Sequence, residues 1–239
     1  MLRLMACLRE LVIANRILGR EGVVDAFGHV SVRHPDNPER FLLSQSRSPE
    51  LVSIDDIMEF TLDGVPVEPQ GRTPYAERVI HGGIYESRPE VNGIVHNHSP
   101  EVIPFGITDT KLRPVGHTCA PIGNEIPVWD IRTKFGNATD MLLVNMDQSR
   151  DLARSLGSRR VALMRGHGSV TAGATVKEAV MIAVYLQVNA RIQLEAIRLG
   201  NVNYLTPEEV ESCTRRQLSP LAIDRAWDYW KARAGCAGM

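Results

Sequence analysis

Three histidines in this sequence have a spacing that suits a metal ion. In the run Val91–His98, strand alternation puts His96 and His98 on one face with their backbones about 7 Å apart. Two such rings can converge on one ion, and a His-x-His pair on a strand is a common chelating arrangement. His167 is the candidate third ligand, because it follows a buried apolar run and lies between two glycines that permit a sharp turn. Taken alone, each histidine is equally compatible with an ordinary structural role.

The candidate acid–base group is Glu77. If Thr73 caps a helix, Glu77 lies beside the apolar stripe marked by Ile80 and Ile84. A carboxylate in that position is partly desolvated, which favours its protonated form and suits proton exchange with a substrate. A surface glutamate that pairs with Arg78 or with the helix dipole is the alternative, and local pattern alone favours it.

The other histidines carry weaker signals. His81 follows Glu77 by one helical turn and either orients that carboxylate or packs against its neighbours. His34 lies in a proline-bearing turn and is expected to be solvated. For His29 and His117 the local pattern decides nothing.

Helices at the two ends of the chain and strands in its middle must position these side chains. The predicted helices are Leu4–Leu18, Thr73–Ser87, a short one from Ser99-Pro100, Asp147–Leu156, and three that begin at Thr175, Thr206 and Ser219. The predicted strands are Val23–Arg33, Phe41–Ser44, an Ile57–Val67 hairpin, Val91–His98, Val161–Arg165 and several within Leu112–Val144. We therefore expect an α/β fold, with a mostly antiparallel sheet covered by helices in a single domain over residues 1–239.

The composition excludes several classes of partner. The chain has 239 residues, with 27 Lys and Arg against 28 Asp and Glu, so nothing favours a nucleic acid. Its four cysteines lack the spacing of a zinc or redox motif and are expected to be reduced thiols in the cytoplasm. Charged residues interrupt the apolar N-terminal segment, so we expect neither a signal peptide nor a membrane anchor.

Several ordered motifs resemble the class II aldolase/adducin family over most of the chain. They are Gly28–Arg33, Glu77 followed nineteen residues later by His96-Asn97-His98, and Arg165–Gly168 before Gly173-Ala174-Thr175. The resemblance implies a three-layer α/β/α fold and a homotetramer with active sites between subunits. It also implies one divalent ion per subunit, zinc or manganese with cobalt or iron as alternatives, held by the three histidines, and it places the family's catalytic acid/base on Glu77.

The sequence departs from the sugar-phosphate aldolases of that family at their phosphate-binding positions. Those enzymes usually carry Gly-Asn at positions 28–29, a Thr-Pro-Ser-Gly-like loop near 44–47, and two serines at 75–76, where this chain has Tyr75-Ala76. The candidate substrate-binding residues that stand in their place are His29, Arg33, Ser46, Arg47 and Tyr75. Arginine forks and an aromatic face suit a planar carboxylate better than a phosphate.

Two further segments, Tyr75–His81 and Arg113–His117, resemble the branch that contains 3-hydroxy-2-methylpyridine-4,5-dicarboxylate decarboxylase and dihydroxyphthalate decarboxylase. This resemblance predicts a metal-dependent decarboxylase of a hydroxylated aromatic or heteroaromatic carboxylic acid. The metal would act as a Lewis acid and Glu77 as the proton donor. His117 would assist the proton transfer or line the pocket.

Three alternatives stay open. The first is a class II aldolase that cleaves a non-phosphorylated hydroxy-carbonyl substrate, since retro-aldol cleavage also needs a stabilised carbanion beside a metal. The second is a non-haem iron oxygenase acting on an aromatic acid, because three histidines also suit iron. The third is a non-enzymatic assembly module like the adducin branch, against which the presence of Glu77 and all three histidines argues.

Overall fold

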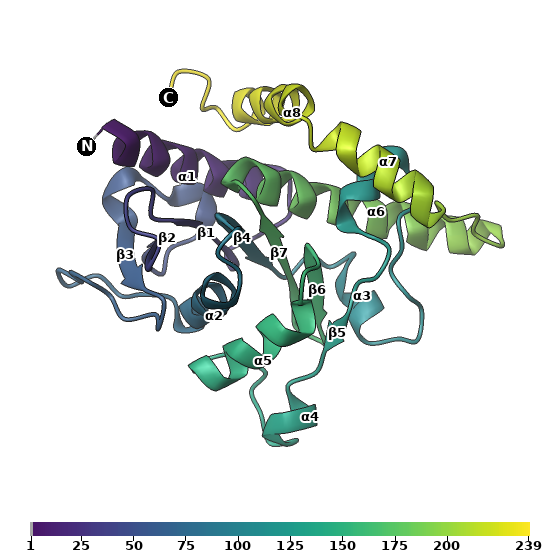
Figure 1. The fold of residues 1–239 in the computed structure, drawn as a ribbon, viewed down its shortest axis with the longest axis horizontal. Helices are drawn as coiled ribbons and strands as arrows, with labels where there is room; N and C mark the ends of the chain where they lie inside the picture. The colour runs from purple at the N-terminus through teal and green to yellow at the C-terminus, as the bar shows by residue number, and fades with distance from the viewer. Residues whose placement is uncertain (1) are drawn as a thin grey trace.

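In the computed structural model, which describes residues 2–239, seven strands form one sheet in the order β3-β2-β1-β4-β7-β6-β5 (Figure 1). Every neighbouring pair is antiparallel except β5 and β6. The strands are β1 (His29–Arg33), β2 (Arg40–Ser44), β3 (Ile57–Thr61), β4 (Gly93–Asn97), β5 (Val128–Trp129), β6 (Val161–Met164) and β7 (Gly168–Gly173). The predicted mostly antiparallel sheet is confirmed.

Helices cover both faces of this sheet. They are α1 (Leu2–Arg20), α2 (Val79–Ser87), α3 (Ile103–Gly106), α4 (Arg132–Phe135), α5 (Met146–Leu156), α6 (Val176–Leu199), α7 (Pro207–Gln217) and α8 (Pro220–Arg233). Helices α1, α6 and α8 lie on one side of the sheet and α2 and α5 on the other, which confirms the three-layer arrangement (Figure 1). None of the helices among residues 2–239 has the length and apolarity needed to cross a bilayer.

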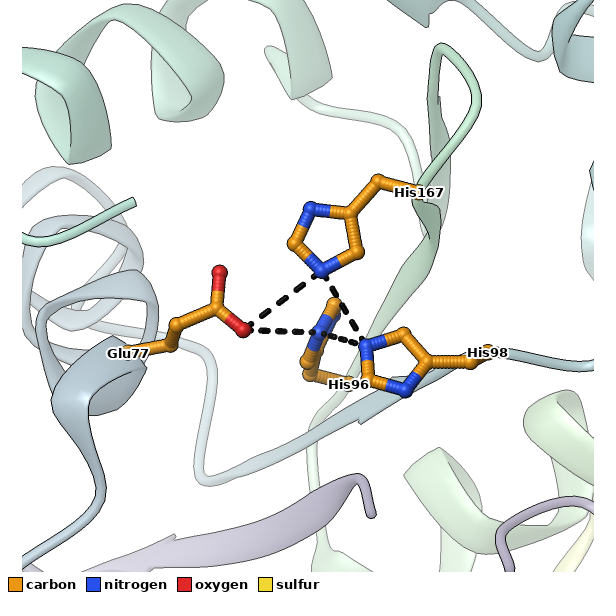
Figure 2. Close-up of side chains that lie close together, drawn as sticks. All are labelled: Glu77, His96, His98 and His167. Atoms are coloured by element: carbon orange, nitrogen blue, oxygen red, sulfur yellow. Dashed lines mark hydrogen bonds and ion pairs between the residues drawn. The ribbon is translucent and has the colours of Figure 1, made fainter. Parts of the chain in front are cut away.

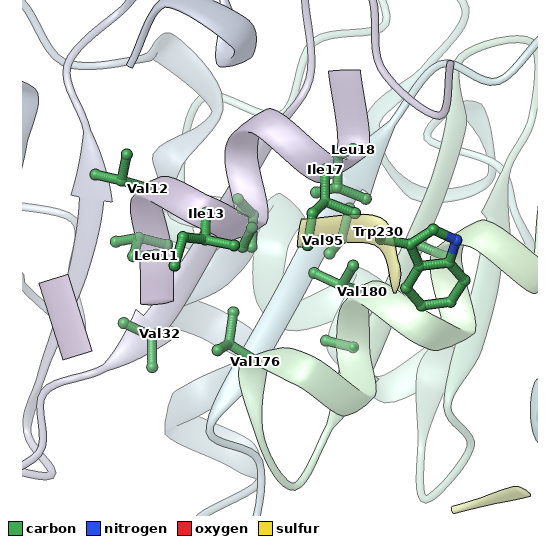
Figure 3. Close-up of a cluster of buried hydrophobic side chains, with 14 of the residues drawn as sticks. Leu11, Val12, Ile13, Ile17, Leu18, Val32, Val95, Val176, Val180 and Trp230 are labelled. Atoms are coloured by element: carbon green, nitrogen blue, oxygen red, sulfur yellow. The ribbon is translucent and has the colours of Figure 1, made fainter. Parts of the chain in front are cut away.

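The two faces of the sheet have separate cores, because successive strand residues point to opposite faces. Val32 and Val95 pack under α1 and α6, with Ile17 and Val180 among the side chains that meet them (Figure 3). On the other face Ile94 belongs to the core under α2 and α5. Each fully buried aliphatic side chain stabilises the fold by about 1.5–3 kcal/mol.

The helix predicted from Thr73 begins later than expected. Gln45 pairs with Pro74 in an isolated β-bridge, and the Ser46 N–H donates to the Thr73 carbonyl at 2.7 Å. These pairings hold the chain extended as far as Tyr75, after which a 3-10 turn over Ala76–Arg78 leads into α2. Thr73 is therefore not a helix cap, and Glu77 lies in the 3-10 turn.

The strands predicted within Leu112–Val144 were wrong apart from the two-residue β5. Side-chain amides of α6 occupy the backbone groups that a neighbouring strand would otherwise bind. Asn189 accepts from the Val115 N–H and donates to the Arg113 carbonyl, and Gln193 does the same for the Arg113 N–H and the Lys111 carbonyl. The segment is satisfied without joining the sheet.

Three smaller differences concern strands. Strand β7 was not predicted, although the alternating run from Ser169 to Ala172 lies between glycines. Strand β1 starts at His29 rather than Val23. In the predicted Ile57–Val67 hairpin, the returning arm is reduced to a single bridge between Phe60 and Pro66.

A substitution at the start of β4 tests how closely α6 packs on the sheet. A Cβ atom at Gly93 would lie 2.6 Å from the Thr175 carbonyl oxygen and 2.6 Å from the Val176 Cα, and neither backbone atom can move cheaply. Gly93→Ala should therefore lower the free energy of unfolding by about 1–3 kcal/mol, measured by denaturant titration. Gly116→Ala is the matched control, because a Cβ there meets nothing within 4 Å. Equal unfolding midpoints for the two variants would contradict this packing.

Candidate metal centre

Glu77, His96, His98 and His167 converge on one point between the sheet and α2 (Figure 2). Their candidate ligand atoms all lie within 4.8 Å of one another. The Nε2 atom of His98 is 3.0 Å from Nε2 of His96 and 3.1 Å from Nε2 of His167. Glu77 Oε2 is 3.4 Å from Nε2 of His167 and 3.7 Å from Nε2 of His96.

Sheet register and two turns bring these groups together. His96 lies in β4, and His98 follows one residue after that strand ends. His167 lies in the turn between β6 and β7, in which Gly166 has a φ of 62°, a left-handed conformation that glycine adopts without strain. Pairing of β4 with β7 then sets His96 opposite Val170, so the turn lies beside the end of β4.

Two backbone carbonyls set the direction of the imidazoles. Nδ1 of His96 lies 3.1 Å from the Ser169 carbonyl oxygen, and Nδ1 of His167 lies 3.0 Å from that of Met141. Because a carbonyl can only accept, each Nδ1 must carry the hydrogen and donate it. Each Nε2 is then left with a lone pair directed at the centre of the cluster, as in metal-binding histidines whose other ring nitrogen donates to a backbone carbonyl.

The donor set fits a divalent cation. Burial, with the neighbouring His167 and His29 rings, lowers the pKa of His96 well below its usual value, and burial also lowers the pKa of His98. The Nε2 lone pairs of His96 and His167 can both bind a cation, and His98 Nε2 lies 3.0–3.1 Å from these two atoms. Nitrogen ligands around a tetrahedral zinc ion are roughly 3.3 Å apart, given Zn–N bonds near 2.0–2.1 Å.

One loop holds both Glu77 and a histidine of the cluster. Glu77 is buried, with 7% of its surface exposed, and its Oε1 accepts a hydrogen bond from the Leu143 N–H at 3.0 Å. Leu143 is two residues from Met141, whose carbonyl accepts from His167. Glu77 Oε2 is thereby turned toward the histidines, where a carboxylate can either complete a coordination shell or exchange a proton with a bound molecule.

Two of the predicted substrate-binding residues, His29 and Tyr75, lie beside the cluster, and two others, Ser46 and Arg47, lie next to Tyr75. The His29 ring is 5.0 Å from the His96 ring and 4.7 Å from the Tyr75 ring, measured between centroids. The Tyr75 hydroxyl donates to the Arg47 carbonyl, and the preceding residue Ser46 is tied by its N–H to the same extended segment. The half-exposed Arg47 guanidinium makes a 3.3 Å ion pair with Asp56, which leaves other N–H groups for a ligand.

The structure does not bring the other two candidates to the cluster. Arg33 lies at the opposite end of β1 from His29, about 13 Å along the strand. Its guanidinium donates to the carbonyls of Pro38, Tyr85, Arg88 and Val91, so its hydrogen-bonding capacity serves the fold. His117 is exposed and lines a surface pocket with Arg215 and Arg225 of α7 and α8.

Two features of the site were missed in the sequence. The loop Met141–Leu143 carries no chemically distinctive side chain, and it acts through its backbone. His81 does not orient Glu77 as considered above, because its Nε2 lies 2.6 Å from Nδ1 of His29. The sequence carried a signal for this contact: His29 and Ser31 alternate onto one face of a strand, and His81 and Tyr85 have helical spacing.

Proteins similar to this chain include decarboxylases and aldolases. The chain is 32% identical to the decarboxylase tropJ of Talaromyces stipitatus, over 97% of this chain and 95% of that protein. It is 26% identical to 3,4-dihydroxyphthalate decarboxylase of Arthrobacter keyseri, over 80% of this chain and 78% of that one. The structure superposes on L-fuculose 1-phosphate aldolase of Glaciozyma antarctica with a TM-score of 0.79, 22% identity, and 98% and 91% coverage of the two chains.

The family model of the class II aldolase and adducin N-terminal domain matches residues 9–194, which include every residue of the histidine and glutamate cluster. This chain belongs to the class II aldolase and adducin family.

Proposed function

We propose that this chain is a metal-dependent carbon–carbon lyase that decarboxylates a hydroxylated aromatic or heteroaromatic carboxylic acid. The observation that carries the proposal is the convergence of three imidazole Nε2 atoms with the carboxylate of Glu77, of which Glu77 and His96 are buried. The similarity to proteins named as decarboxylases supports this choice of reaction. The groups that replace the family's usual phosphate-binding serines support the choice of a carboxylate substrate.

His96, His98 and His167 would hold one divalent ion, zinc or manganese, with cobalt or iron as alternatives. When bound, such an ion supplies Lewis-acid stabilisation of the negative charge that develops on a substrate oxygen. The residues themselves prepare the site before any ion binds. The Ser169 and Met141 carbonyls hold the His96 and His167 rings in one tautomer, and the His96 ring is fully buried.

Glu77 would supply the proton. In decarboxylation the bond between the ring carbon and the carboxylate carbon breaks, carbon dioxide leaves, and the electron pair stays with the ring. A protonated Glu77 transfers its hydrogen from Oε2 to that ring carbon and regains one from water afterwards. The Leu143 N–H bond to Oε1 holds the carboxyl group so that Oε2 faces the cluster.

The substrate would lie against His29 and Tyr75, with Ser46 and Arg47 toward its second carboxylate or another polar substituent. Arg33 is no longer a candidate, because its guanidinium is committed to backbone carbonyls. His117 lies away from the cluster of its own chain. It would act only in a homotetramer with active sites between subunits, which we propose by analogy with the family.

Metal content tests the ligands. The isolated protein should contain close to one divalent ion per chain by elemental analysis, and His98→Ala should lose most of it. Loss of a group that only hydrogen-bonds to a metal ligand weakens metal binding about 10–100-fold, so loss of a ligand itself should weaken binding at least as much. His34→Gln serves as the control, since His34 lies outside the cluster. Undetectable metal in the wild-type protein and in protein reconstituted with zinc or manganese would overturn the ligand assignment.

Replacement of Glu77 tests the proton donor. Glu77→Gln keeps a carbonyl oxygen to accept the Leu143 N–H but cannot deliver the proton, so kcat should fall about 10²–10⁴-fold while metal content is retained. Glu86→Gln, which changes an exposed carboxylate on α2 paired with Arg150, is the matched control and should keep wild-type kcat. If Glu77→Gln turned over at the wild-type rate, proton donation would have to be assigned elsewhere.

A product assay separates the three reactions. Metal-loaded protein is incubated with a panel of hydroxylated aromatic acids and of non-phosphorylated hydroxy-carbonyl compounds, while carbon dioxide and aldehyde are measured separately with and without oxygen. We expect carbon dioxide from an aromatic acid, independent of oxygen. Aldehyde without carbon dioxide would identify an aldolase, and activity that needs both oxygen and ferrous ion would identify an oxygenase.

A further inference from the structure

Four polar side chains form a buried row behind the metal cluster, and none of them is a proposed metal ligand. His29 Nδ1 lies 2.6 Å from His81 Nε2, and His81 Nδ1 lies 2.6 Å from the Ser31 hydroxyl oxygen. That oxygen lies 2.9 Å from the hydroxyl of Tyr85. None of the four residues is more than 3% exposed.

Secondary structure brings the row together. Alternation along β1 turns His29 and Ser31 toward α2, whereas Val30 between them joins the core under α1 and α6. On α2, His81 and Tyr85 are four residues apart and therefore lie on the same face of the helix. The strand and the helix thus contribute two residues each to one hydrogen-bonded chain.

One hydrogen lies in the 2.6 Å contact between His29 Nδ1 and His81 Nε2, because two N–H groups or two lone pairs that faced each other at that distance would repel. Burial also lowers the pKa of His81 to about 3, so that ring carries one hydrogen. The hydrogen bonds of the row can therefore run in only two directions, which differ in which ring donates.

Tyr85 decides between the two directions. Its hydroxyl has Ser31 as its sole hydrogen-bond partner within residues 2–239. If Tyr85 donates to Ser31, then Ser31 donates to His81 Nδ1, and His81 Nε2–H donates to His29 Nδ1. In the reverse direction the buried phenol hydrogen has no acceptor, and a buried unsatisfied donor is unfavourable.

We infer that His81, directed by Ser31 and Tyr85, is a positioning residue that holds His29 in the tautomer with its hydrogen on Nε2. Nε2 lies across the ring from the contact with His81 and has no hydrogen-bond partner among the described residues, but it is not one of their fully buried unpartnered atoms, so its hydrogen can reach a bound ligand or water. Beside it lie the rings of His96 and Tyr75. His29 therefore presents an N–H donor at the edge of the metal cluster, suited to an anionic oxygen of the substrate. The role of this N–H toward a substrate rests on the proposed function, whereas the tautomer itself does not.

Nuclear magnetic resonance of the zinc-loaded full chain tests the tautomer without any substrate. Carbon-13 and nitrogen-15 are incorporated at histidine only, His29 is assigned with a His29→Gln variant, and solid-state spectra report which ring nitrogen carries hydrogen. We expect hydrogen on Nε2 of His29. Tyr85→Phe removes the terminal donor and should give a mixture of both tautomers. Ser149→Ala, which removes a buried hydroxyl that donates to the Val79 carbonyl, should leave His29 unchanged.

Hydrogen on Nδ1 of His29 in the wild type would overturn the inference, and so would an unmixed tautomer in Tyr85→Phe. Kinetics give a second test if an aromatic acid proves to be a substrate. His81→Leu should raise KM about tenfold or more. His81→Gln should bring KM much closer to the wild-type value, because the amide N–H can still donate to His29 Nδ1. Failure of every aromatic acid as a substrate would count against the proposed function and would leave the tautomer result intact.

Discussion

Two unprotonated Nε2 atoms, those of His96 and His167, face the same point in this site, and neither can donate a hydrogen bond to the other. The Ser169 and Met141 carbonyls impose this arrangement, because each accepts from an Nδ1–H. A cation at the centre would be attracted by both lone pairs. Strand β7, which contains Ser169, and the loop that contains Met141 thus orient two of the three imidazoles.

The register of the sheet also positions His96. His96 stands opposite His29 on β1 and opposite Val170 on β7. A slip of one residue in either pairing would turn the imidazole toward the apolar core under α1 and α6. The site and the fold are therefore specified together, since the apolar residues Val30 and Val95 on the reverse face oppose such a slip.

The interior between β1 and α2 is polar where most sheet–helix interfaces are apolar. His29, Ser31 and Arg33 all point toward α2, and each finds a partner there, in His81, Tyr85 or the Tyr85 carbonyl. These bonds offset the cost of burying polar groups. They also make the position of His29 depend on α2. The contacts that join β1 to α2 therefore also shape the site.

The sequence alone determined much of this protein. Strand alternation predicted the pairing of His96 with His98, the helical periods predicted α5 and α6, and the ordered motifs identified the family, whose match covers residues 9–194. These features were accessible because local periodicity and residue type are sufficient to specify them.

Tertiary structure decided the rest. Arg33 and Arg47 are equally plausible carboxylate anchors in the sequence, and only the fold commits Arg33 to backbone carbonyls. The segment around Val115 is apolar enough for a strand, but side chains of α6 that lie 74–80 residues away in sequence satisfy its backbone. The loop Met141–Leu143 holds His167 and Glu77 through backbone atoms that every residue has. Contacts of this kind join distant parts of the chain and leave no local pattern, so they become visible only when the chain is folded.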